Sequence, residues 1–195
     1  MEKSAYYLLI ENLSKRGIDY ESSHSERKTV LPGTGWTPSA KFVLAPIDSL
    51  YFFANDSFAN TMQTSIISTG VYGIINLPPK AECMIYKKDW LDRFLRSGKV
   101  KTGNSYIDDR LTITSGSGWN ASGLLTESNV KVFLEIAKRF LPTKMIIQPG
   151  YLSFIEALKG KTVIGIEANQ WLYKKEDLDL MLGLGARLIT SIQNK

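Results

Sequence analysis

The sequence predicts an α+β fold: a single domain spanning residues 1–195, with N-terminal, central and C-terminal helices packed on a mostly antiparallel or mixed sheet. The predicted strands come in runs between a few helices, whereas a parallel α/β fold would alternate strand and helix strictly. A chain of 195 residues that is 44% hydrophobic and 11% aromatic is long and apolar enough to form one folded core. The one candidate domain boundary, the Pro- and Gly-rich segment 31–38, would separate a piece too short to fold alone.

Four segments have the apolar spacing typical of helices: residues 4–16, 89–96, 126–141 and 176–192. The third carries the clearest signals, because Thr126 can cap its first turn and Pro142 ends it. Gly183 and Gly185 leave two alternatives for the last segment. It is one continuous helix, or it is a shorter helix followed by a final strand at 186–192.

Short runs rich in β-branched and aromatic residues predict strands at 41–44, 49–54, 82–86, 105–115 and 144–148. Segment 65–76 is interrupted by Gly70 and Gly73 and is predicted to be two strands joined by a turn or bulge. Residues 151–158 and 161–168 are predicted to form a hairpin, although the first arm could also be helical. Glu156 and Glu167 would then be candidates for a carboxylate pair across the hairpin. Such a pair depends on a strand register that the sequence does not determine.

Segment 105–115 shows the clearest alternation of apolar and polar residues. Because successive strand side chains point to opposite faces, Asp108 and Arg110 should share one face and can pair, and Asp109 should point toward the core. A carboxylate in that position is partnered, lies at a bulge, or faces a pocket. If the protein is an enzyme that uses acidic residues around Asp109, then Asp109 must open to a pocket and lie beside another carboxylate or a lysine.

The chain contains one histidine and one cysteine, which excludes an internal disulfide, a cysteine-based zinc site and a histidine-pair metal motif. His24 lies in a polar segment predicted to be a loop or a solvent-facing strand, so it is a poor candidate for a catalytic base. Cys83 lies next to apolar residues in a predicted strand, which favours a buried, inert thiol. No nucleotide-binding glycine motif is present. We therefore expect no metal, no cofactor and no disulfide-linked partner.

The net charge of +5 and the isoelectric point near 9.2 reflect a local excess of basic residues between positions 87 and 101. The basic residues in this span are Lys87, Lys88, Arg93, Arg96, Lys99 and Lys101. They could attract an anionic partner: phosphate, nucleic acid or a membrane surface. Trp90 and Phe94 fall on the apolar stripe of the predicted helix, which buries them and argues against base stacking on this surface.

Trp36 and Trp119 each follow a glycine-rich loop, in Gly-Thr-Gly-Trp and Gly-Ser-Gly-Trp, and are the tryptophans best placed to line a cleft. Asp108 and Arg110 are polar ligand-binding candidates. The sequences flanking the two tetrapeptides do not match, so the pattern does not establish an internal repeat.

No segment has the roughly 20 apolar residues needed to cross a bilayer, and we expect a cytoplasmic protein. A soluble domain trimmed from a secreted or membrane-anchored protein would look the same. By elimination, the sequence predicts a non-catalytic binding or scaffolding module of unknown partner. One alternative is electrostatic binding of nucleic acid or anionic lipid through residues 87–101. The other is an enzyme that uses acidic residues around Asp109.

Overall fold

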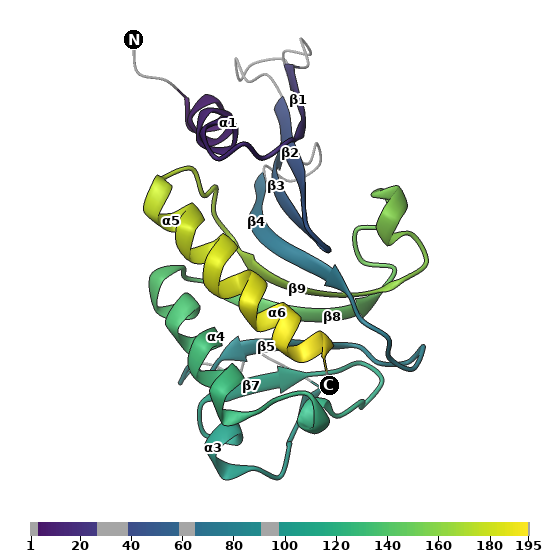
Figure 1. Cartoon of the computed structure of the whole chain (residues 1–195). Coiled ribbons are helices and arrows are strands. Elements are labelled where there is room, and N and C mark those ends of the chain that lie inside the picture. The colour runs from purple at the N-terminus through teal and green to yellow at the C-terminus, as the bar shows by residue number, and fades with distance from the viewer. Residues whose placement is uncertain (1–3, 27–38, 59–64, 91–97, 195) are drawn as a thin grey trace, which may run out of the picture.

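The fold is built on one antiparallel sheet, seen in the computed structural model, which describes residues 4–26, 39–58, 65–90 and 98–194 (Figure 1). Within these residues nine strands pair in the order β1-β2-β3-β4-β9-β8-β5-β7-β6. Their bounds, in sheet order, are Glu21–Glu26, Ser39–Ile47, Leu50–Phe58, Ser65–Ile74, Thr162–Ala168, Thr143–Pro149, Cys83–Lys87, Leu111–Thr114 and Lys99–Val100. Every pairing is antiparallel, which confirms the predicted sheet type and the α+β class.

The main described helices are α1 (Ala5–Lys15), α4 (Glu127–Arg139), α5 (Lys175–Leu180) and α6 (Ala186–Gln193). The Thr126 side chain accepts a hydrogen bond from the backbone N–H of Asn129, so the predicted cap of α4 is confirmed. A π-helical turn, η3 (Met181–Gly185), joins α5 to α6. The C-terminal segment is therefore one helical run, and the alternative of a final strand at 186–192 is wrong. None of the described helices is long and apolar enough to cross a membrane.

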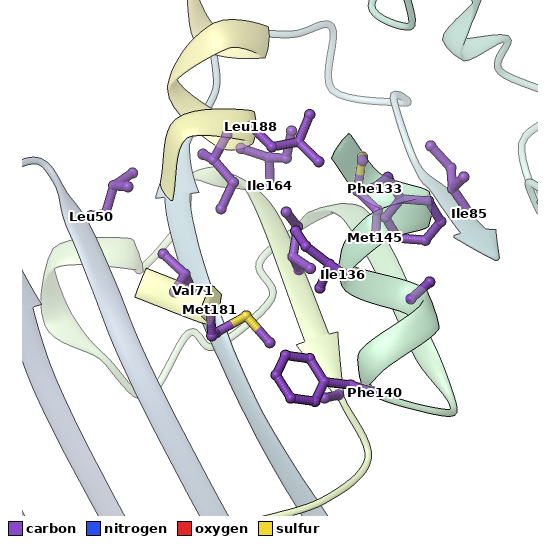
Figure 2. Packing of buried hydrophobic residues seen from close by; sticks show 14 of the residues in the cluster. Leu50, Val71, Ile85, Phe133, Ile136, Phe140, Met145, Ile164, Met181 and Leu188 are labelled. Atoms are coloured by element: carbon purple, nitrogen blue, oxygen red, sulfur yellow. The ribbon is translucent and has the colours of Figure 1, made fainter. Parts of the chain in front are cut away.

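The hydrophobic core lies between α4, the α5–α6 run and one face of the sheet (Figure 2). Figure 1 shows the two helical segments lying next to each other across that face. The core side chains labelled in Figure 2 include Phe133 and Ile136 of α4, Leu188 of α6, and Val71 and Ile164 of the sheet. Full burial of a side chain of this size stabilises the fold by about 1.5–3 kcal/mol.

The two faces of the sheet have different partners because side chains alternate along each strand. Phe52 belongs to the core beneath the helices, whereas its neighbour Phe53 packs in a second cluster with Tyr72, Ile155 and Leu158. We call the face that carries Phe53 and Tyr72 the open face. Part of it is covered by residues 150–161, the loop that connects β8 to β9.

The predicted strand at 105–115 is wrong in its first half. Residues Ser105–Asp108 form a short helix, α3, and the strand begins only at Leu111. The Asn104 side chain caps this helix by accepting from the N–H of Tyr106, and the Asp108 carboxylate accepts from Thr102 and Gly103. These local side-chain bonds offer the backbone an alternative to a sheet ladder, and here they prevail.

The predicted hairpin is also placed differently. Strand β9 coincides with the predicted second arm, but it pairs with β8. The predicted first arm, 151–158, is part of the connecting loop and contains a short 3-10 helix, Glu156–Leu158.

The predicted helix at 89–96 lies mostly outside the described residues. Its described tryptophan, Trp90, is 76% exposed, so the expectation that this side chain is buried is wrong.

Candidate functional site

The open face contains a groove with a cavity volume of about 860 Å³. One side is formed by strands β1 to β4, β8 and β9, and the other by the β8–β9 loop. Its apolar lining includes Phe42, Leu44, Tyr51, Phe53, Phe154 and Ile155. Ligand pockets commonly have volumes of about 300–1,000 Å³ and a largely apolar and aromatic lining, so this groove is suited to a small molecule.

One row of paired residues crosses the floor of the groove. Leu44 opposes Phe53, Phe53 opposes Gly70, Gly70 opposes Glu167, and Glu167 opposes Lys144. Residues directly opposite one another in a sheet project from the same face. The apolar side chains of Leu44 and Phe53 therefore lie on the same face as the charged pair Glu167 and Lys144.

Two glycines in the floor create room for the ring of Tyr72. A methyl group at Gly165 would overlap that ring, and one at Gly70 would lie 2.6 Å from the Tyr72 hydroxyl. Tyr72 is fully buried, so its ring occupies the space that side chains at both positions would otherwise fill. This position brings the hydroxyl group to the carboxylate of Glu167.

Glu167, which is only 4% exposed, is the centre of a polar cluster with Tyr72, Tyr151 and Lys144. We call these four residues the Glu167 cluster. The hydroxyl groups of Tyr72 and Tyr151 donate to Oε2 at 2.9 and 2.6 Å, and the Lys144 ammonium lies 2.9 Å from Oε1. Burial, followed by the charge of Glu167, raises the pKa of both tyrosines. Both hydroxyls therefore stay protonated and act as donors, and the buried carboxylate has the three partners that its burial requires.

The mouth of the groove exposes aromatic rings. Phe154, on the loop, is 68% exposed, and Phe42, on β2, is 37% exposed. The Phe53 ring lies between them, with centroid distances of 5.3 Å to Phe154 and 6.5 Å to Phe42. These contacts join the loop to the sheet through one continuous aromatic surface, on which the apolar part of a ligand can pack.

Sequence reasoning missed this site, apart from the carboxylates. Glu156 and Glu167 both line the groove, but they do not act as a matched pair. Glu167 is held within its cluster, whereas Glu156 is exposed and contacts Lys159 at 3.4 Å. The structure has one continuous strand, β4, where the sequence predicts two strands joined by a turn or bulge at 65–76. Gly70 in this segment is a usable signal of the site, because a glycine in a strand often marks a close approach by another group.

The candidates around Asp109 lie elsewhere. Asp109 is exposed and does not point into the core, so that expectation is wrong. It lines a second groove, of about 820 Å³, with Asp108 and three lysines.

Asp108 and Arg110 have different partners. Burial would raise the pKa of Asp108, but hydrogen bonds from Thr102 and Gly103 and the nearby Lys101 hold it below its ordinary value. The Arg110 guanidinium lies 3.9 Å from the centre of the Tyr106 ring.

The second groove therefore contains a carboxylate beside lysines, as an enzyme centred on Asp109 requires. Asp89 and Asp108 supply the other two carboxylates of this lining, and that of Asp108 accepts three hydrogen bonds from Thr102 and Gly103 and holds the turn before α3 in place. This is a structural use of the carboxylate, and it favours a binding surface over a catalytic pair.

The predicted anion-binding residues are only partly described. Lys88, Lys99 and Lys101 line the second groove, and Lys87 is exposed nearby, whereas Arg93 and Arg96 lie outside the described residues. The lysines face Asp89, Asp108 and Asp109, so the charges of the lining balance. Trp36 also lies outside the described residues, and Trp119 is half-buried against the hydrophobic core.

The remaining reactive side chains occupy the surroundings that the sequence predicts. Cys83 is a buried free thiol, and burial followed by the charge of Glu82 raises its pKa to about 12. His24 lies on strand β1, with its ring 5.3 Å from that of Tyr6. Within the described part of the chain, no group of three or more His, Cys, Asp or Glu side chains could hold a metal ion.

Comparison of the chain with protein-family models, curated proteins and solved structures finds no match. The geometry of the two grooves is therefore the only indication of function in the described part of the chain.

Proposed function

We propose that this protein is a non-catalytic binding module whose open-face groove holds a small molecule with an apolar body. The observation that carries the proposal is the aromatic groove of about 860 Å³, closed on one side by the protein's own β8–β9 loop. A cavity of this size and lining buries most of the surface of a drug-sized molecule. The rings of Phe42, Phe53 and Phe154 supply the apolar contact area.

The Glu167 cluster supports binding over catalysis. A general base needs a carboxylate that is free to accept a proton from substrate, but three donors already surround Glu167. The raised pKa of Tyr72 and Tyr151 keeps their hydroxyls protonated near neutral pH, which makes them poor nucleophiles. The cluster instead holds the floor and the loop in one arrangement, as a preorganised binding site requires.

Nile red, a neutral dye that fluoresces in apolar surroundings, is a direct probe of this groove. We expect saturable binding to the intact protein and about tenfold weaker binding to Phe154→Ala, because a packed aromatic group contributes roughly 1–1.5 kcal/mol. Phe154 is largely exposed, so the fold should survive its loss.

The matched control for this experiment is Tyr7→Ala, which removes another exposed aromatic side chain, on α1 and outside the groove lining. We expect this variant to bind the dye as the wild type does. Unsaturable binding, or equal losses in the two variants, would overturn the proposal.

One observation favours a second candidate, the binding of single-stranded nucleic acid at the second groove. Trp90 is 76% exposed and lines this groove together with Lys88, Lys99 and Lys101. An exposed ring among cations is the arrangement on which unpaired bases stack. The three aspartates of the same lining reduce the attraction, which is why we place this candidate second.

Titration with a thymidine oligonucleotide tests the second candidate. Affinity should fall steeply between about 50 and 200 mM salt, and both Trp90→Ala and Lys101→Gln should weaken binding about tenfold. Binding that does not depend on salt, or that Trp90→Ala leaves unchanged, would rule the candidate out.

A further inference from the structure

We propose that the open-face groove selects amphipathic organic cations, molecules that carry an ammonium head on an apolar body. This inference rests on the proposed function. Its first observation is charge: the groove is lined by three carboxylates, on Glu21, Glu156 and Glu167, and by one ammonium group, on Lys144. The lining is therefore negative although the whole chain carries +5.

The charges that meet a ligand are those at the mouth of the groove. Lys144 and Glu167 form an ion pair at 2.9 Å with side chains 23% and 5% exposed, so they largely neutralise each other. Among the described residues, no hydrogen bond or ion pair involves the side chain of Glu21. Glu156 is 87% exposed, and its surface pair with Lys159, worth about 0–1 kcal/mol, leaves its carboxylate available.

The aromatic lining favours the same sign of charge. A ring presents a negative face, and a cation within about 6 Å of its centre is attracted. Tyr51, Phe53, Tyr151 and Phe154 all line the groove, so a cation can contact ring faces and carboxylates together. An anion at the same place would be repelled by both.

The spacing of these groups fits an extended amphipathic molecule. Glu21 opposes Leu44, and Leu44 opposes Phe53 on the next strand. With strands about 4.8 Å apart, Glu21 lies roughly 10 Å across the sheet from Phe53. A head group held near Glu21 therefore allows a hydrocarbon body to lie over Leu44 and Phe53.

A series of ligands with the same chain and different heads measures this selectivity. Decyltrimethylammonium, decanol and decyl sulfate are titrated into the protein by calorimetry, all below micelle-forming concentrations. We expect the ammonium compound to bind about tenfold tighter than decanol, and decyl sulfate to bind weakest. Higher ionic strength should reduce the preference, because the mouth carboxylates are exposed to solvent.

Charge-removing variants link the preference to named residues. Glu21→Gln and Glu156→Gln should each reduce the preference for decyltrimethylammonium over decanol by about threefold, with decanol affinity unchanged. Glu176→Gln, an exposed carboxylate on α5 and outside the groove lining, is the control and should have no effect.

The possible results distinguish a failure of the cation selectivity from a failure of the proposed binding function. If no ligand of the series binds, the proposed function itself fails. Equal binding of all three keeps the groove as an apolar site and overturns the cation selectivity. Tighter binding of decyl sulfate also overturns it. A preference that survives in the double variant Glu21→Gln, Glu156→Gln overturns it as well.

Discussion

Replacing Glu167 by alanine should lower the free energy of unfolding by about 3–5 kcal/mol, the usual cost of breaking a buried ion pair on one side. The change leaves the Lys144 ammonium, with its side chain 23% exposed, without its carboxylate. It also leaves the hydroxyl of fully buried Tyr72 without the acceptor that lies 2.9 Å away. Partial exposure of Lys144 places the expected value at the lower end of this range. Urea unfolding followed by circular dichroism measures it, provided that the m-value is unchanged.

Two further variants test the reason for this loss. Glu156→Ala removes an exposed glutamate of the same groove and should cost less than about 1 kcal/mol, because its pair with Lys159 is solvent-exposed. Glu167→Gln keeps the shape and an acceptor for the tyrosines but removes the charge, so its cost should fall between the other two. A Glu167→Ala protein as stable as Glu156→Ala would contradict the importance that we assign to the cluster.

Gly165→Ala should destabilise the protein by about 2–3 kcal/mol, the typical cost of overpacking a close-packed site. The added methyl group would overlap the ring of Tyr72, which is fully buried, and close-packed interiors accommodate added volume poorly. The displaced hydroxyl would also lose its optimal position against Glu167. Urea unfolding followed by circular dichroism measures this loss of stability. The Gly165→Ala variant should also bind Nile red more weakly, because Tyr72 supports the floor of the groove.

The control for this change is Gly183→Ala, at a helical position where an added methyl group meets nothing within 4 Å. We expect it to stabilise the protein by up to about 1 kcal/mol, since alanine favours helix more than glycine does. In a Tyr72→Ala background, Gly165→Ala should become nearly neutral because the overlapping ring is absent. An unchanged cost in that background would show that Tyr72 is not the cause.

Much of the local structure could be predicted from the sequence. The cap at Thr126 and the apolar stripe of the following helix are interactions between residues a few positions apart, so they are visible in the chain itself. The same is true of the strand Thr162–Ala168, whereas the choice between one C-terminal helical run and a helix followed by a strand required the structure. The helix at 105–108, where a strand is predicted, has an equally local cause: the side chains of Asn104 and Asp108 make turn-forming hydrogen bonds with neighbouring residues.

The candidate site was not predictable in the same way. Tyr72 and Glu167 are 95 residues apart in sequence, and they meet only because β4 pairs with β9 in one register. A shift of that register by one residue would move Glu167 to the helix-covered face. The position of residues 150–161 over the open face likewise depends on contacts with distant strands.

Side-chain spacing and the chemistry of adjacent residues are sufficient to predict the α+β class, helices α1 and α4, most of the strands and the inert surroundings of Cys83. The order of the strands, the space that Gly70 and Gly165 leave for Tyr72, and hence the groove are visible only in the folded chain. These features arise from pairing between segments far apart in the chain, and the pattern within one segment does not record which partner it will meet.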